Sequence, residues 1–160
     1  MKLVIAILML LMTGCSWREQ AQPMQGTDTL PPALAKQILD DQYSGCLPGR
    51  VMLDVQYWNH QSWDLNNDGK PDFVIEQEDP SFCGSGGCGT LVYVSTAEGF
   101  RCVYSGGCFY SEIAPLPFKT NGYQDLIFKN TTVTEDAFYT VLWFDGHEYQ
   151  DVNPGRTESE

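Results

Sequence analysis

Apolar and polar positions alternate along most of the chain after Arg50. The first such pattern, with the period of two that is typical of a half-buried strand, is formed by Val51, Leu53, Val55 and Tyr57. A short apolar run, Phe73–Ile75, follows, and further strands are predicted at 90–95, 99–104, 109–113, 124–128 and 138–144. Glycine-rich and asparagine-rich turn sequences separate these segments. Asp145-Gly146, placed between two apolar stretches, predicts a tight hairpin. Short strands joined by such turns predict an antiparallel meander.

One segment has helical rather than strand periodicity. Leu34, Ile38 and Leu39 share one helical face within 33–42, and the preceding Pro31-Pro32 fits a helix start. The fold class is therefore mainly β (α+β), an antiparallel β-meander with one short N-terminal helix. Large aromatic side chains are expected to fill the core, namely Trp58, Trp63, Phe100, Phe128, Trp143 and Tyr149.

The N-terminal residues carry the pattern of a secretory signal. Lys2 precedes the apolar run Leu3–Met12, which is too short to cross a bilayer core of roughly 30 Å as a helix. The run ends in Leu-Met-Thr-Gly-Cys, which resembles a bacterial lipobox and implies that Cys15 is lipidated. The alternative is an ordinary signal cut near Gly14. Ser16 favours the outer membrane, where the lipid would anchor a periplasm-facing protein without spanning the membrane.

The predicted organisation has four parts: a signal peptide at 1–14, a flexible tether at 15–30, a single β-rich domain at 31–154 and an acidic tail at 155–160. The formal net charge of the whole chain is −12 at pH 7. This charge argues against nucleic acid and against an anionic membrane surface as partners. It is compatible with a basic protein partner, with bound cations, or simply with solubility.

Six cysteines are present, in a compartment where disulfides form. The glycine-rich loop between Cys83 and Cys88 predicts a bridge between these two. A second bridge is predicted between Cys102 and Cys108, with the pairing of Cys46 to either one as the competing scheme. One thiol is left over in both schemes. A zinc site is disfavoured because the cysteine pairs are spaced too widely.

The stretch 64–72 carries the chemistry that is most specific in this chain. Oxygen-bearing side chains stand at loop positions one, three, five and nine, and Gly69 stands at position six. Hard cations such as Ca²⁺ bind six to eight oxygens, and this spacing aims alternate side chains inward from a turning backbone. Glycine allows the positive φ that a sharp turn needs.

Two known types of calcium loop share part of this pattern. An EF-hand needs a bidentate Glu at position twelve, where this chain has Ile75, and the exiting residues favour a strand over a helix. The stretch instead resembles the strand–loop–strand calcium sites of FG-GAP and VCBS repeats, which occur in β-propeller blades. That resemblance implies a blade-like meander and a structural Ca²⁺ held by Asp64, Asn66, Asp68, Asp72 and the carbonyl of Lys70.

A broader resemblance covers most of the domain. Small bacterial envelope proteins of no assigned activity share the order of four features found here, at 64–72, 83–88, 122–127 and 143–149. The third feature lies within 121–128, which resembles a degenerate second copy of the calcium repeat. Because this copy lacks the acidic positions, it is expected to bind no ion.

These observations favour a lipid-anchored, calcium-binding, disulfide-braced envelope module that acts by protein interaction or in a structural role. Its partner would be an unknown envelope protein. One alternative is an immunity or inhibitor protein directed against a toxin or hydrolase. Another is a hydrolase, but no catalytic residues are predicted, because no spacing places two acids across a cleft. The acids considered were Glu76, Glu78, Asp79 and Glu112.

Overall fold

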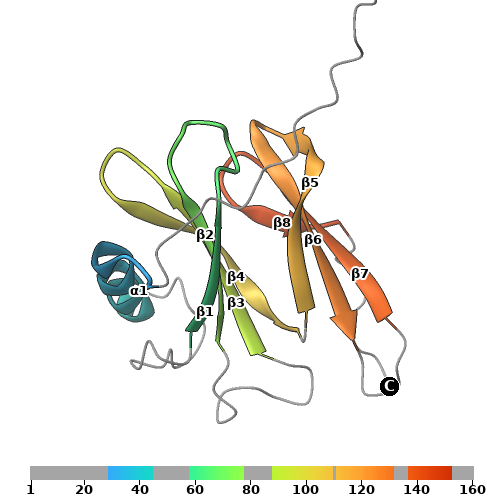
Figure 1. Cartoon of the computed structure of the whole chain (residues 1–160), viewed down its shortest axis with the longest axis horizontal. Coiled ribbons are helices and arrows are strands. Elements are labelled where there is room, and N and C mark those ends of the chain that lie inside the picture. Colours follow the sequence, from blue (N-terminus) through green and yellow to red (C-terminus); the bar gives the residue numbers. More distant parts are fainter. Residues whose placement is uncertain (1–28, 45–57, 78–87, 110, 132–136, 153–160) are drawn as a thin grey trace, which may run out of the picture.

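The computed structural model describes residues 29–44, 58–77, 88–109, 111–131 and 137–152. The predicted signal peptide, most of the tether and the acidic tail lie outside these residues, as does the strand predicted at 51–57. None of the helices in the described part has the length and apolarity needed to cross a membrane. The described elements, drawn in Figure 1, are α1 (Pro32–Ser44), β1 (Trp58–Trp63), β2 (Asp72–Gln77), β3 (Cys88–Ser95), β4 (Phe100–Phe109), β5 (Ser111–Thr120), β6 (Tyr123–Thr131), β7 (Ala137–Phe144) and β8 (Tyr149–Asp151).

The strands form two four-stranded sheets, each built from consecutive strands. The first sheet has the order β1-β2-β3-β4 and the second has the order β5-β6-β7-β8. Every neighbouring pair is antiparallel. The mainly β class, the antiparallel meander and the short N-terminal helix are thus confirmed. In Figure 1, α1, the first sheet and the second sheet follow one another from left to right.

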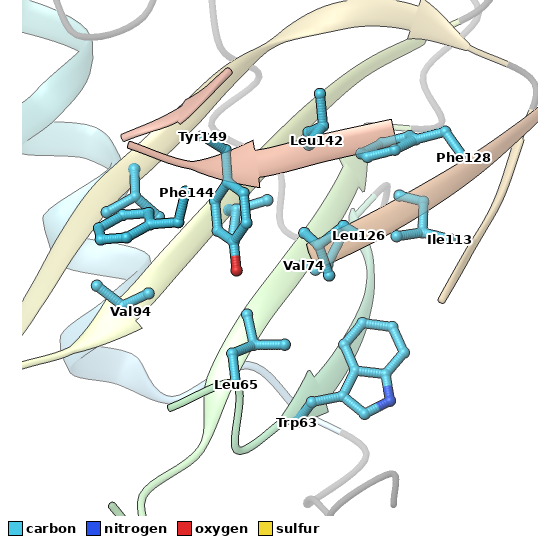
Figure 2. Packing of buried hydrophobic residues seen from close by; sticks show 12 residues of the cluster. Trp63, Leu65, Val74, Val94, Ile113, Leu126, Phe128, Leu142, Phe144 and Tyr149 are labelled. Carbon is cyan, nitrogen blue, oxygen red and sulfur yellow. The ribbon is translucent and has the colours of Figure 1, made fainter. Parts of the chain in front are cut away.

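The first sheet is buried on both faces. One face packs against the second sheet in a shared core, shown in Figure 2, to which the first sheet and its loop contribute Trp63, Leu65, Val74, Val92, Val94 and Val103. The other face packs with α1 in a cluster made of Leu34, Ile38, Trp58, Phe73, Ile75, Leu91 and Tyr93. Helix α1 therefore covers one side of the first sheet and the second sheet covers the other.

The second sheet buries only its inner face among the described residues. Leu126, Phe128 and Leu142 point into the shared core, whereas Tyr139 is 58% exposed and Trp143 is 36% exposed. The prediction that Trp143 belongs to the core is therefore wrong. Trp143 stands between two inward-facing positions of β7, so the alternation of a strand turns its ring to the outer face. The other predicted core aromatics are buried, except Phe100, which is partly buried.

The predicted Asp-Gly hairpin is confirmed between β7 and β8. Asp145 N donates to Glu148 O at 3.0 Å, and Gly146 has a φ of 109°. The Asp145 carboxylate also accepts backbone amides from His147 at 2.7 Å and from Glu148 at 2.9 Å. These bonds, that from Glu148 first, lower the pKa of Asp145. The turn is thus held by the side chain that the sequence placed at its start.

Candidate metal site

The acidic loop joins two paired strands of the first sheet. Strand β1 ends at Trp63, β2 begins at Asp72, and these two residues are partners in the ladder. The predicted strand after the loop is thus confirmed, and the geometry is strand–loop–strand rather than the loop–helix arrangement of an EF-hand. Two residues adopt positive φ, Asn67 at 65° and Gly69 at 82°. Asparagine and glycine are the residues that tolerate this conformation, so the sequence permits the double bend.

Side chains within the loop hold its backbone amides. Asp64 accepts from Asp68 N at 2.9 Å and from Gly69 N at 2.8 Å, through its two carboxylate oxygens. Asn66 Oδ1 also accepts from Asp68 N, at 2.9 Å, and Asp68 Oδ1 accepts from Lys70 N at 2.8 Å. The oxygens at positions one, three and five are therefore drawn onto the same bend, as their spacing predicted.

Asp72, at position nine, has a different environment. Its side chain is fully buried, and its two oxygens accept from Leu65 N at 2.9 Å and from Ser95 N at 2.8 Å. Burial raises the pKa of Asp72 to about 6, the charges of Asp68 and Asp64 add to the rise, and the two amide bonds oppose it. Asp72 thus ties the start of the loop to the end of β3, a role that its position in the motif did not reveal.

The loop also contacts the second sheet. Gln124 N donates to Leu65 O at 2.8 Å, and Asn66 Nδ2 lies 3.3 Å from the hydroxyl of Tyr123. Tyr149 donates its hydroxyl to Gln124 O at 2.7 Å, and Figure 2 shows this hydroxyl directed toward Leu65. Sequence reasoning missed these contacts. Tyr123 and Gln124 lie within 121–128, and the resemblance of this segment to the acidic loop was the signal that could have pointed to them.

The chemistry of the donors fits a hard cation. Carboxylate, amide and carbonyl oxygens are the ligands that Ca²⁺ prefers, and an oxygen that accepts one amide bond keeps a second lone pair. Among the described residues, no three or more His, Cys, Asp or Glu side chains are grouped closely enough to hold a metal ion. Asn66 Nδ2 lies 3.2 Å from Asp68 Oδ2, and both Asp72 oxygens face amides. Ligation by all five predicted groups would therefore require Asp68 and Asp72 to turn toward the ion.

The described cysteines bear on one of the predicted bridges. Cys102 and Cys108 lie on the same strand, β4. Six residues of extended chain span about 20 Å, whereas a disulfide needs Cα atoms within about 7 Å. Strand β4 therefore does not accommodate the predicted Cys102–Cys108 bridge, and Cys102 Sγ instead lies 3.4 Å from Tyr104 O. The Cys83–Cys88 bridge stays a prediction, because Cys83 lies outside the described residues, as do Cys15 and Cys46.

Of the acids considered for hydrolysis, Glu76 lies on β2, in the first sheet, and Glu112 lies on β5, in the second. Glu78 and Asp79 lie outside the described residues. Comparison of the chain with protein-family models, with curated proteins and with solved structures finds no match. The functional argument therefore rests on the acidic loop and on the surfaces of the two sheets.

Proposed function

We propose that this protein is a lipid-anchored, calcium-binding module of a bacterial envelope that acts by protein interaction or in a structural role. The observation that carries the calcium part is the set of amide bonds made by Asp64, Asn66 and Asp68 inside one bend. These bonds organise the loop backbone and leave lone pairs on hard oxygen donors. The anchor is proposed from the lipobox-like sequence that ends at Cys15.

The ion would have a structural effect at the junction of the two sheets. Asp64, Asp68 and Asp72 bring three carboxylates into one short segment, and Lys70 offsets only part of their repulsion. Because Leu65, within the loop, accepts an amide bond from the second sheet, a bound cation that fixes the loop also fixes the contact between the sheets. Calcium modules outside the cytoplasm bind at about 10⁻⁴–10⁻³ M, which suits this role.

Thermal melting of the mature protein in calcium and in chelator tests the proposal. Ligand at about 100 times its Kd stabilises the folded state by about 2.7 kcal/mol, so the melting temperature should rise by several degrees. Asp68→Asn should abolish the rise. The matched control is Asp145→Asn, which alters another turn aspartate that accepts backbone amides. An unchanged melting temperature of the unaltered protein at millimolar calcium would refute the calcium site.

A second measurement addresses the interaction role. The tagged mature protein is used to capture envelope proteins in calcium, in chelator, and as the Asp68→Asn variant. A partner that is retained only by the unaltered protein in calcium would support an ion-dependent interaction module. Retention of the same partner in all three conditions would separate partner binding from the ion and leave the calcium with a stabilising role alone.

A further inference from the structure

The outer face of the second sheet carries a row of two aromatic rings with a carboxylate between them. Strands β6 and β7 are in register up to the pair Leu126↔Leu142, so Asp125 and Trp143 are the next residues across the two strands. On the other side of β6, the pairs Pro115↔Leu126 and Lys119↔Gln124 enclose a bulge of β5. Asp125 faces this bulge, which ends at Phe118.

All three side chains lie away from the shared core. Gln124 and Leu126 are buried, and the alternation of β6 turns Asp125 to the opposite face. Phe118 is 60% exposed and Trp143 is 36% exposed, and both are among the exposed large apolar side chains of the described residues. Neighbouring strands lie about 4.8 Å apart, so Asp125 and Trp143 are close enough to contact one ammonium or guanidinium group and its alkyl stem. Phe118 lies in the bulge of β5 on the other side of Asp125.

The carboxylate in this row has unused bonding capacity. Asp125 Oδ1 is shielded from water and accepts no hydrogen bond from a described residue. A sheltered carboxylate oxygen without a donor is costly, and a cationic donor would relieve that cost. The terminal torsion of an aspartate is soft, so a small rotation of the carboxyl presents this oxygen to a group above the sheet.

The charge of the protein and the chemistry of the two rings both favour a positively charged ligand. An aromatic face attracts a cation within about 6 Å of its centre, and the attraction is strongest for tryptophan. The whole chain has 21 acidic residues against 9 lysines and arginines, which repels an anionic ligand and draws a basic one. An apolar ligand would use the rings but would leave the Asp125 carboxylate without a donor.

We propose that Phe118, Asp125 and Trp143 form a binding site for a lysine or arginine side chain of a basic partner protein. This inference rests on the proposed interaction function and gives that function a surface and a partner chemistry. The alkyl stem of the partner side chain lies against the two rings, and its charged end meets the carboxylate. The site shares no residue with the acidic loop, so binding of the basic side chain and binding of calcium can be tested with different variants.

Titration with oligopeptides tests the site. The mature full-length protein is titrated with hexalysine, hexaarginine and hexaglutamate at about 150 mM salt, where exposed charges are screened beyond roughly 8 Å. Binding is followed by calorimetry and by the indole NMR signal of Trp143. We expect both basic peptides to bind and to shift that signal, and hexaglutamate to do neither. Asp125→Asn and Trp143→Ala should each weaken binding at least fivefold, whereas Asp125→Glu and Trp143→Phe should retain most of it.

The control removes the same charge elsewhere. Glu98 lies in the exposed turn between β3 and β4, and Glu98→Gln should change affinity less than twofold. Equal losses in Glu98→Gln and Asp125→Asn would mean that binding follows net charge alone and would overturn the site. Absence of binding to the basic peptides would also overturn the site. Self-association of the protein that Trp143→Ala abolishes would overturn it too, because the row would then bind a second copy of this chain. The calcium-dependent rise in melting temperature should persist in Asp125→Asn. If calcium does not raise the melting temperature of the unaltered protein, the calcium proposal is refuted, whereas the proposed site for a basic side chain is unaffected.

Discussion

The two sheets have the same number of strands and the same meander order, yet they differ in how many faces they bury. The first sheet lies between α1 and the second sheet, so Phe73 and Tyr93 are as inaccessible as Val74 and Val92. The second sheet buries the inner side of β7 and exposes Tyr139 on the outer side. A sheet that is covered on both faces serves as structure, whereas a sheet with one open face has surface available for binding.

The amino-acid sequence shows this difference only in part. Strands β2 and β3 contain the unbroken apolar runs Phe73–Ile75 and Leu91–Val94, as expected for strands that are buried on both sides. Strands β6 and β7 also contain apolar runs, Leu126–Phe128 and Val141–Phe144, but within them only alternate residues are buried. An apolar run therefore does not by itself distinguish a sheet covered on both faces from one with an open face.

The largest effect is expected from truncation on the helix-facing side of the first sheet. Phe73 is 4% exposed and packs edge-on against Phe100, with ring centroids 5.7 Å apart. Phe73→Ala should lower the free energy of unfolding by about 3–5 kcal/mol. The matched control on the open face of the second sheet, Tyr139→Ala, should change it by about 0.5 kcal/mol or less. Urea unfolding measures both. Equal losses would show that the two sheets are covered alike.

Next in size is the loss of the buried carboxylate at the junction. Asp72→Ala leaves the amides of Leu65 and Ser95 without their acceptor. An orphaned buried amide costs about 1–3 kcal/mol, so the expected loss is about 3 kcal/mol in chelator. Asp68→Ala, on the exposed side of the same loop, should cost about 1 kcal/mol under these conditions. A larger loss of stability for Asp68→Ala than for Asp72→Ala would show that the exposed residues of the loop contribute more to stability than the buried carboxylate.

Much of the fold follows from local patterns in the sequence. The helix at 32–44, strands β2, β3, β6 and β7 and the Asp-Gly hairpin are each specified by periodicity or by a turn sequence. Strand β4 was predicted to end at residue 104, but it continues through the glycines to Phe109. The geometry of the acidic loop could also be predicted from the sequence, because the spacing of Asp64, Asn66 and Asp68 dictates which backbone amides their oxygens reach. Such features depend on residues close together in the chain, where pattern and structure correspond directly.

Features that depend on the sheet as a whole could not be predicted from the sequence. Strand β1 is too polar at its centre to resemble a strand, and it forms because β2 pairs with it along its whole length. Strand β5 was predicted only up to residue 113, since Pro115 and Pro117 argue against a strand. It extends to Thr120 because an edge position and a bulge tolerate prolines.

The candidate site shows the same division between local and long-range information. The spacing of Asp64, Asn66 and Asp68 predicted their shared bend, but the partners that Asp72 and Asn66 find outside the loop lie 23 and 57 residues away. Similarly, the close sequence spacing of Cys102 and Cys108 suggested a bridge, and the extended strand that carries both separates them. Contacts across a sheet need the register, which spacing alone does not supply.

A smaller effect is expected at the turn that docks on the loop. Gly122 has a φ of 89°, and a Cβ there would meet nothing within 4 Å. Gly122→Ala should therefore cost only the strain of the left-handed conformation, about 1–2 kcal/mol. In the loop of the first sheet, Asn67→Gly should be nearly neutral, because it removes a mild strain at a φ of 65° and adds chain flexibility. Chemical denaturation measures the stability of both variants. A Gly122→Ala variant as stable as the unaltered protein would show that this turn relaxes to a conformation without strain.

A pH dependence of opposite sign is expected at two carboxyls, Asp72 at the start of β2 and Asp145 in the hairpin of the second sheet. Burial raises the pKa of Asp72 to about 6 from 3.8, so the folded state holds this proton more tightly than the unfolded state. The resulting stability is complete below pH 3.8 and is lost as the pH rises through 6, about 1 kcal/mol of it between pH 5 and 7. In Asp145 the backbone amides of Glu148 and His147 lower the pKa, so its contribution is present at neutral pH and is lost in acid. Melting in chelator from pH 3 to 7 should therefore show a shallower decline toward neutral pH for Asp72→Asn and a shallower decline toward acid for Asp145→Asn. Profiles that change in the same direction for both variants would show that the buried carboxyl at the sheet junction is as well solvated as the one in the exposed hairpin.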